Sequence, residues 1–418
     1  MPTRPLPGTM AIVTEGEPHE EPVWSELWTR DQGNGFARDL FQESFGYAAK
    51  TAKSAPGRVT IVGEHTDYSG GLTLATSTQQ ASYAAGASRA DDVVRVSWLD
   101  HAGEAHLWQG TLDDARPGRP GDYSVKTLGA LWALSERGFS GGGVDIAIRT
   151  CVPEHAGIAE GVSVLAAIAL LVQDLWGLAL DTDAGRIELA EVCIDAETGF
   201  SGVPTAGMVQ HTVLRCPPGQ AVLLDFGGLP PKLTSLPLYF PEYGLGLLLI
   251  DTGKPNPLTL AEYSSRWDQV AAASAELGAA RLRDVADGSH ALRRVESLSD
   301  PLLRRRARHV VTEIQRVRIV VAELSGTAPA HERFVTIGKA LYRAHASLEV
   351  DYELSNPEVD MVVEGAFRAG ALGARLVEGG FGGAAVALVR RAQADSMARA
   401  ISALMVDAGY AAPTFSMI

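Results

Sequence analysis

The strongest constraint on the fold is an apolar segment before the middle of the chain. Between residues 162 and 179, apolar side chains dominate all round the helix that this segment predicts. Such a helix offers water no polar face, so it is expected to be buried. The other long apolar stretches, residues 243–250 and 383–389, have strand length, and none approaches the roughly 20 residues of a membrane span. The sequence therefore predicts a soluble globular protein without a membrane partner.

The composition indicates which kinds of partner and which cellular compartment to expect. A chain of 418 residues is long enough for two domains, and its net charge of −14 would repel a nucleic acid. The three cysteines, Cys151, Cys193 and Cys216, are spaced too irregularly for a disulfide framework or a metal knuckle, which favours a reducing cytoplasm. Residues 1–22 contain no apolar run of signal-peptide length and are interpreted as a loose N-terminal arm.

Periodicity predicts an α+β fold. Strands are predicted at residues 58–62, 72–75, 81–86, 93–98, 105–108, 143–150, 220–226, 245–251, 373–377 and 383–389. Helices are predicted in residues 22–47, where helical spacing begins at Trp24, and at 124–138, 162–179, 186–197, 259–277, 301–324, 332–348, 357–370 and 391–408. This mixture favours α+β over a regular βαβ array. A Pro- and Gly-rich stretch near 230 predicts a crossover between domains at 23–230 and 231–418.

The first candidate site follows a short apolar strand, in "PGRVTIVGEHTDYSGG" (residues 56–71). Glu64, His65, Asp67 and Tyr68 occupy one tight loop there. Carboxylates accept hydrogen bonds from hydroxyl groups, and His and Tyr can donate or accept, so the cluster suits a polyhydroxylated ligand. The alternative is a solvated, charged turn.

The same stretch resembles the galactokinase signature, Gly-Arg-Val-Asn-Leu-Ile-Gly-Glu-His-Thr-Asp-Tyr, and differs from it only at Thr60, Ile61 and Val62. Further segments are similar to other motifs of that family: "IDTGKPNPLTLAEYSSR", "RRRARHVVTEIQRV", "LYRAHASLEVDYELSNPEVDMVV" and "GALGARLVEGGFGGAAVALV". The resemblance therefore covers most of the chain.

The resemblance implies the two-domain GHMP kinase fold, with a ribosomal-protein-S5-like N-terminal domain, a ferredoxin-like C-terminal domain and the active site between them. It implies a monomer that phosphorylates the anomeric hydroxyl of a galactose-type sugar with Mg-ATP. By resemblance, Glu64, His65, Asp67 and Tyr263 hold the sugar, and Arg58 lies beside its reacting hydroxyl.

The second candidate site, "VPEHAGIAEGV" (residues 152–162), departs from the family's phosphate loop, Pro-x-Gly-x-Gly-Leu-Ser-Ser-Ser. Gly157 is kept, but His155 replaces a glycine, and Ala159, Glu160 and Gly161 replace the serine triplet. At an effective dielectric near 20, two like charges about 4 Å apart cost on the order of 4 kcal/mol, about three decades of affinity. Glu160 therefore disfavours phosphate.

Two other roles for Glu160 stay open. A glutamate is favourable in the first turn of any helix, and a carboxylate is a common Mg²⁺ ligand. The adjacent nucleotide pocket departs from the family too, since Tyr123 and Lys126 stand where the family usually has Trp and Tyr.

The third stretch, "AETGFSGVPTAGMVQHTV", resembles the family segment that ends Gly-Ile-Met-Asp-Gln. Val209 occupies the position of the family's catalytic aspartate, the proposed base, and valine accepts no proton. General base catalysis contributes about 10²–10⁴-fold. His211 could replace that base, although an ordinary strand or loop histidine is the simpler interpretation.

The fourth stretch, "LVEGGFGG" (residues 376–383), differs from the family's glycine-rich motif at Val377 and Glu378. By resemblance it closes over the phosphates, with Gly379 and Gly380 in contact with nucleotide, and Glu378 adds a second carboxylate there. The glycines could instead serve the fold alone.

These departures converge on the phosphate half of the reaction, whereas the sugar half is nearly intact. The sequence therefore favours a galactokinase-like protein that binds a galactose-type sugar and is inactive or strongly impaired as a kinase, with a sensor or regulatory role. One alternative is an active sugar kinase with a rearranged ATP site. Another is a different reaction on a sugar or sugar phosphate. No metal site is predicted, and no cofactor beyond Mg-ATP if the chain is active.

Overall fold

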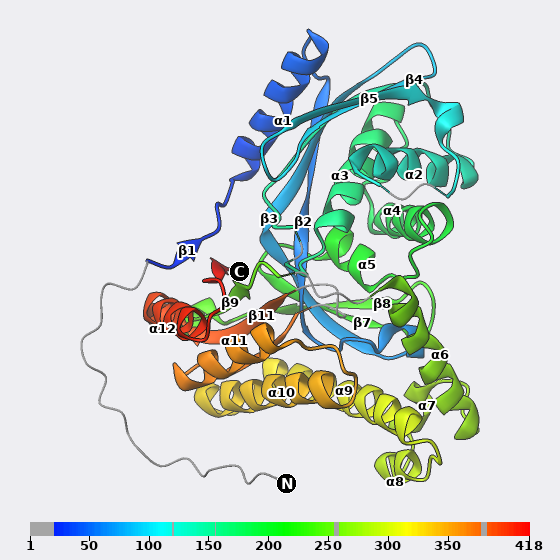
Figure 1. The fold of residues 1–418 in the computed structure, drawn as a ribbon. Helices are drawn as coiled ribbons and strands as arrows, with labels where there is room; N and C mark the ends of the chain where they lie inside the picture. Colours follow the sequence, from blue (N-terminus) through cyan, green and yellow to red (C-terminus); the bar gives the residue numbers. More distant parts are fainter. Residues whose placement is uncertain (1–20, 119–120, 155, 255–258, 378–382) are drawn as a thin grey trace.

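The computed structural model describes residues 21–118, 121–154, 156–254, 259–377 and 383–418. Nearly all of the expected N-terminal arm lies outside these ranges, as do four residues singled out above, His155, Glu378, Gly379 and Gly380. Twelve strands and twelve α-helices span the described residues (Figure 1).

Two sheets organise the chain. The seven-stranded sheet has the order β5-β4-β6-β3-β7-β8, with β2 also paired to β3. Its strands are β2 (Thr51–Val62), β3 (Leu72–Ser88), β4 (Val93–Leu99), β5 (Ala105–Thr111), β6 (Val144–Thr150), β7 (Gln220–Asp225) and β8 (Lys232–Pro237). The five-stranded sheet has the order β1-β12-β9-β11-β10. Its strands are β1 (Val23–Trp24), β9 (Leu245–Asp251), β10 (Gly373–Leu376), β11 (Ala384–Arg390) and β12 (Thr414–Met417).

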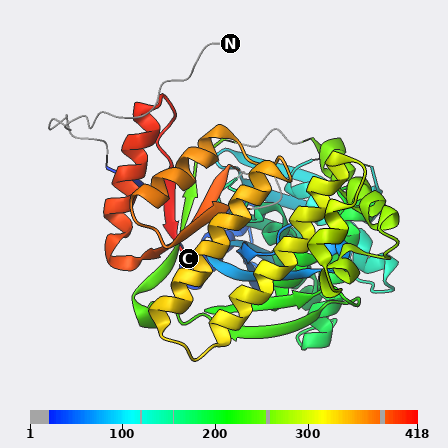
Figure 2. The same ribbon diagram turned by 90° about the horizontal axis from the view of Figure 1, so that it is seen from below.

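Helices cover both sheets (Figures 1 and 2). Those before the second sheet are α1 (Arg30–Phe45), α2 (Tyr123–Glu136), α3 (Glu160–Trp176), α4 (Asp183–Asp195) and α5 (Met208–Arg215). The later ones are α6 (Leu260–Glu276), α7 (Leu282–Asp287), α8 (Ala291–Glu296), α9 (Pro301–Ser325), α10 (Ala330–Val350), α11 (Pro357–Arg368) and α12 (Ala394–Asp407). Most strand pairs are antiparallel, and β4 and β6 are parallel, so the α+β prediction is confirmed.

The predicted buried helix is α3, and it lies against one face of the seven-stranded sheet. Alternation along the strands explains why: Ala84 and Ile146 pack with α3, whereas Tyr83 and Ala85 pack with α1 on the opposite face. Residues 164–169 of α3 are all at most 2% exposed, because the sheet, α2 and α4 all contact this helix.

Three local predictions are wrong. Trp24 belongs to strand β1 rather than to a helix, because Thr29 caps α1 and forms a capping box with Gln32 that fixes the helix start at Arg30. The strands predicted at 72–75 and 81–86 are one strand, β3, whose first half pairs with β7 and whose second half pairs with β6. His211 lies in helix α5, not in a strand or loop.

The two sheets share a hydrophobic core. Val59 and Leu74 of the first sheet cluster with Leu248 of the second sheet and Val310 of α9. Strand β1 joins the second sheet although it comes before every strand of the first, and β8 joins the first although it follows residue 231. The expected domain limits, 23–230 and 231–418, therefore remain a prediction.

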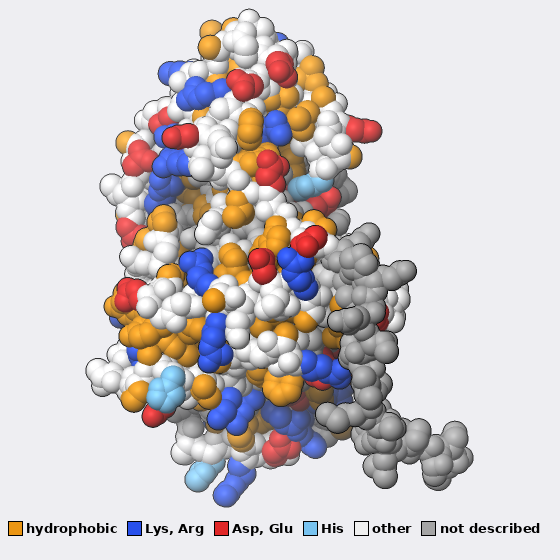
Figure 3. All heavy atoms as spheres, turned by 90° about the vertical axis from the view of Figure 1, so that its left-hand side faces the viewer, with side chains coloured by type: hydrophobic (Ala, Val, Ile, Leu, Met, Phe, Trp, Pro, Cys, Tyr) orange, Lys and Arg blue, Asp and Glu red, His pale blue; other side chains and the backbone are white. Residues whose placement is uncertain are grey.

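Two expectations from the sequence concern the helices and the surface. One is the absence of a membrane span, and the other is a negative net charge. None of the helices among the described residues is long and apolar enough to cross a bilayer. Figure 3 shows acidic and basic side chains interspersed on the face that it presents. The negative net charge of the chain is therefore not gathered in a single patch on that face.

Candidate functional site

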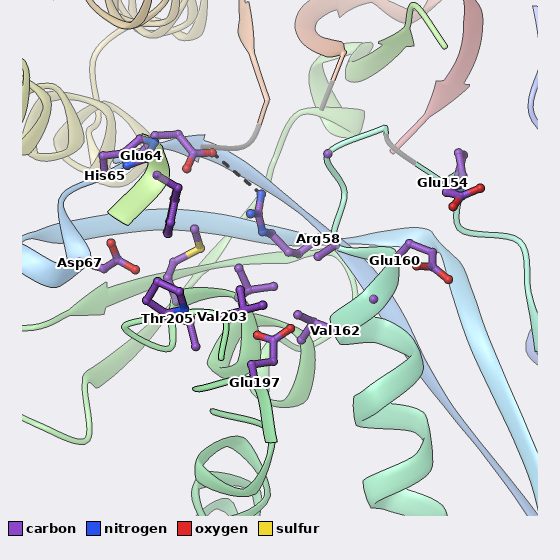
Figure 4. A pocket seen from close by; sticks show the side chains of 18 residues that line it. Arg58, Glu64, His65, Asp67, Glu154, Glu160, Val162, Glu197, Val203 and Thr205 are labelled. Atoms are coloured by element: carbon purple, nitrogen blue, oxygen red, sulfur yellow. Dashed lines mark ion pairs between the residues drawn. The ribbon is translucent and has the colours of Figure 1, made fainter. Parts of the chain in front are cut away.

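A cavity of about 330 Å³ brings the predicted site residues together (Figure 4). The residues that line it include Arg58, Glu64, His65, Asp67, Gly157, Ala159, Glu160, Gly161, Val209 and Tyr263, whereas Tyr68 of the first candidate cluster does not line it. In Figure 4 the 64–67 loop lies at one end of the cavity, Glu160 and Glu154 lie at the other, and Arg58 lies between them. The end with the 64–67 loop, which the resemblance assigns to the sugar, is called the sugar end, and the end with Glu160 is called the loop end.

Strand β2 positions the sugar end. It carries Arg58 and stops at Val62, and Gly63 then turns with a φ of 109°, where an added Cβ would lie 2.5 Å from the Leu72 carbonyl oxygen. Only glycine fits that turn. His65 follows in the left-handed region with a φ of 60°, a conformation that is uncommon for non-glycine residues and is found often at functional sites.

Two buried arginines bracket the carboxylate of Glu64. Its Oε1 lies 3.9 Å from Nη1 of Arg58 and 3.4 Å from Nη2 of Arg375. Arg375 is fully buried on β10, and its guanidinium also donates to the backbone carbonyls of Thr60, Ile61 and Leu376. This arginine connects the second sheet to the sugar loop. Sequence reasoning missed it, and a charged residue in an otherwise apolar strand was the available signal.

Arg58 has unused donors. Its side chain is 1% exposed, and its Nε and Nη1 atoms find no hydrogen-bond partner among the described residues. Buried donors are nearly always satisfied in native proteins. Because Arg58 lines the cavity, its unsatisfied donors fit a ligand with oxygen acceptors.

Helix α9 holds the sugar loop from behind. Glu313 accepts a hydrogen bond from the Gly63 N–H at 2.8 Å, and Nε2 of His309 lies 3.1 Å from the Glu64 carbonyl oxygen. Burial opposes ionisation of Glu313, but the charges of Arg316 and Arg375 and the hydrogen bond from Gly63 act together against it, and the pKa of Glu313 is lowered to about 2. Burial lowers the pKa of His309 to about 3, so this imidazole is neutral. His309 and Glu313 lie four residues apart, and this i, i+4 spacing was the signal in the sequence that both side chains share one face of α9.

Aromatic and acidic groups complete the sugar end. Nδ1 of His65 lies 3.0 Å from the hydroxyl of Tyr68, which lies 2.7 Å from that of Tyr352. The rings of His65 and Tyr263 are 5.8 Å apart. Burial raises the pKa of Asp67 to about 6, so its carboxylate is ionised at neutral pH and able to accept hydrogen bonds from hydroxyl groups.

The loop end is built on strained backbone. Gly157 and Ala159 have φ values of 68° and 66°, and the Arg58 N–H donates to the Ile158 carbonyl at 2.9 Å. Helix α3 begins at Glu160 without a side-chain cap. Instead, the Glu160 carboxylate accepts a hydrogen bond from the phenol of Tyr123. Burial, with the Glu160 charge, raises the pKa of Tyr123.

The loop offers no hydroxyl to the cavity. Residues 152–162 include no serine or threonine. The next hydroxyl, of Ser163, is fully buried and donates to the Ala55 carbonyl at 2.8 Å, so it ties α3 to β2. The part that serines play in the family's loop is therefore not taken over by Ser163.

Val209 is the second residue of α5 and lines the cavity, with no proton acceptor in its side chain. His211, considered above as its replacement, is fully buried, and its Nε2 lies 3.7 Å from Glu191. It is not among the residues that line the cavity. Glu197 does line it, accepts a hydrogen bond from Gln210, and has a pKa raised by burial.

Two groups of side chains have the spacing of metal ligands within the described ranges: Asp100, Glu104 and His106, and His345, Glu349 and Asp360. Neither group includes a residue that lines the cavity. They have no part in the site described above.

Comparison with known proteins identifies the family. Residues 39–88 match the model of the galactokinase galactose-binding signature, residues 125–213 the GHMP kinase N-terminal domain, and residues 327–407 the GHMP kinase C-terminal domain. The chain is 35% identical over 382 residues to a galactokinase of Streptomyces coelicolor, covering 91% of this chain and 95% of the relative. The chain belongs to the galactokinase family.

Further matches agree with the family and its fold. A galactokinase of Mycobacterium tuberculosis H37Rv is 32% identical, with 87% of this chain and 95% of the relative covered. The crystal structure of Lactococcus lactis galactokinase complexed with galactose superimposes with a TM-score of 0.77 at 24% identity, covering 91% and 96% of the two chains. The Methanococcus jannaschii mevalonate kinase superimposes with a TM-score of 0.60 at 14% identity, covering 88% and 97%. The GHMP kinase fold expected from the motifs is confirmed.

Proposed function

We propose that this galactokinase-family chain binds a galactose-type sugar at the 64–67 end of its cavity and phosphorylates the anomeric hydroxyl slowly with Mg-ATP. The observation that carries the proposal is the position of Arg58, whose unsatisfied donors lie between the sugar loop and the phosphate loop. The sequence alone favoured a non-catalytic sugar-binding protein. The named relatives favour the kinase instead, because both are galactokinases that match nearly their full lengths.

The sugar end suits a hexose. Glu64 and Asp67 provide carboxylate acceptors, and His65 and Tyr263 provide groups that donate or accept. Arg58 and Arg375 lie on either side of the Glu64 carboxylate and hold it in place. A site of this type rejects analogues that lack a hydroxyl, since a buried partner would then stay unpaired.

The transfer is slow because the cavity wall has valine at position 209. Loss of a general base costs about 10²–10⁴-fold in rate. Arg58 remains available to stabilise the developing charge. Mg²⁺ enters with ATP, and the carboxylates of Glu160 and Glu197 on the cavity wall are the ligand type that this ion binds.

A second candidate is sugar binding without transfer. One observation favours it: the Glu160 carboxylate stands at the first turn of α3, where a phosphate of ATP would otherwise meet free N–H groups. In this case the chain would act as a sensor of the sugar, or would keep the sugar bound without converting it.

Two measurements on the purified chain separate these functions. Titration calorimetry with galactose and with Mg-ATP measures binding, and chromatography of the products measures sugar 1-phosphate. Product formation at a rate 10²–10⁴-fold below an ordinary galactokinase supports the proposal. Sugar binding without product supports the second candidate, and absence of hexose binding at millimolar concentration rejects both.

The domain limits and the monomer are proposals as well. We place one domain at residues 23–230 and the other at 231–418, and expect one chain per particle. Limited proteolysis that cuts near residue 230 and light scattering at the mass of one chain, 44.2 kDa, would support them.

A further inference from the structure

The residues that depart from the family motifs at the phosphate end contact one another. Tyr123 and Lys126 lie on the first turn of α2, and Glu160 and Gly161 on the first turn of α3. The phenol of Tyr123 donates to Glu160. A Cβ at position 161 would lie 2.7 Å from the Lys126 ammonium nitrogen. The first turns of α2 and α3 therefore lie against each other at these four positions.

Lys126 occupies the space that a side chain at position 161 would need. Its ammonium nitrogen and its Cε, 2.7 Å and 3.4 Å from where a Cβ would stand, are the only two heavy atoms within 4 Å of that point among the described residues, apart from nearby backbone. Glycine at 161 therefore allows the lysine to reach the start of α3. A cation stands where the family's loop has a serine.

The ammonium of Lys126 is available to a ligand. Among the described residues, no hydrogen bond or ion pair engages it. Its charge acts on Glu197, where burial raises the pKa of the carboxyl and Lys126 opposes the increase. Lys126 and Glu197 also line a smaller cavity of about 180 Å³, and Glu197 and Val203 line both cavities. Lys126 thus lines the smaller space, which adjoins the main cavity at Glu197 and Val203.

We propose that Lys126 is the phosphate-binding cation of this chain and replaces the hydroxyls that its loop lacks. The inference rests on the proposed function, since it assigns the phosphate contact at the edge of the cavity in which the transfer is proposed. A lysine ammonium binds phosphate as a point charge with three donors, and the N–H groups at the start of α3 add to its field. The positive charge of Lys126 also offsets the negative charge of Glu160, which would otherwise repel the phosphate.

Titration calorimetry of the full chain tests this with ATP in EDTA, ATP with Mg²⁺, and adenosine as ligands. Lys126→Met is expected to weaken metal-free ATP binding about 10- to 100-fold, the range for a hydrogen bond to a charged group, and to leave adenosine and galactose binding unchanged. Lys126→Arg is expected to restore most of the ATP affinity. Lys339→Met, at an exposed lysine of α10, is the matched control and is expected to change nothing.

A double-mutant cycle adds a geometric test. Gly161→Ala places a methyl group in the space of the ammonium and is expected to weaken ATP binding in the wild-type chain but not in Lys126→Met. Additive effects of the two changes would contradict the proposal.

The outcomes separate this inference from the proposed function. Equal ATP affinity in wild type and Lys126→Met overturns the inference, even if sugar phosphate is formed. A Lys126-dependent ATP affinity without any product supports the inference and rejects the kinase. If the wild-type chain binds galactose but does not bind ATP, both the inference and the proposed function are rejected.

Discussion

The phenol of Tyr123 donates a hydrogen bond to the Glu160 carboxylate across the first turns of α2 and α3. This contact holds the Glu160 carboxylate in place at the first residue of α3. A negative charge held there opposes phosphate, whereas a neutral group of the same shape would not.

Glu160→Gln is therefore expected to tighten Mg-ATP binding by about tenfold or more. The full Coulomb cost is discounted because Glu160 is partly exposed to solvent, which screens it. Titration calorimetry measures the change, and Glu104→Gln in the exposed β4–β5 turn serves as the control. An unchanged or weaker affinity would mean that Glu160 does not face the phosphates, or that it holds Mg²⁺.

Val209→Asp is expected to raise the rate of sugar phosphorylation by about 10²–10⁴-fold, because it restores a general base on the cavity wall. The second position of α5 also favours an aspartate, since the helix dipole stabilises a negative charge there. Single-turnover kinetics measure the rate.

Val209→Asn separates base catalysis from simple polarity at that position. It has nearly the shape of aspartate but accepts no proton, so it is expected to leave the rate unchanged. Equal gains in both variants would rule out base catalysis at position 209.

Sugar affinity is expected to fall as the pH is lowered through 6. Burial raises the pKa of Asp67 to about 6, so the carboxylate that accepts hydroxyl hydrogen bonds is lost below that pH. One unit lower, at about pH 5, only about a tenth of the sites remain ionised, and affinity falls about tenfold. Isothermal titration with galactose between pH 5 and 8 measures this.

Asp67→Asn provides the control for that pH profile. It is expected to bind the sugar more weakly at pH 7 and to lose the dependence near pH 6. The same raised pKa makes the folded chain bind a proton more tightly than the unfolded chain. The stability contributed by Asp67 is therefore present below its ordinary pKa of 3.8 and is lost as the pH rises through about 6. A profile that persists in Asp67→Asn would assign the titration to another group.

Arg375→Met is expected to destabilise the fold by about 3–5 kcal/mol, because it removes the guanidinium that lies 3.4 Å from the buried Glu64 carboxylate. Urea denaturation measures the free energy of unfolding. Arg368→Met on α11, whose ion pair with Glu364 is exposed, is expected to change it by less than about 1 kcal/mol. Equal effects would show that Arg375 does not support the sugar loop.

The sequence by itself determined the elements whose pattern is local. The apolar segment at 162–179 predicted a buried helix because no face of it suits water, and α3 is that helix. The loop "GEHTDY" predicted the sugar end, since its polar groups are adjacent in the chain and need no distant partner to be recognised. Resemblance to the family's motifs predicted that Arg58, Tyr263 and Val209 belong to one site, and all three line the cavity.

Only the tertiary structure decided which distant residues support or alter that site. Arg375 lies 311 positions after Glu64 and meets it because two sheets share one core, which no local pattern records. His211 is excluded from the cavity by the direction of a helix that the sequence did not predict. The contacts of Tyr123 with Glu160 and of Lys126 with Gly161 depend on the packing of α2 against α3. Side-chain proximity across elements follows from packing, and packing depends on the whole chain at once.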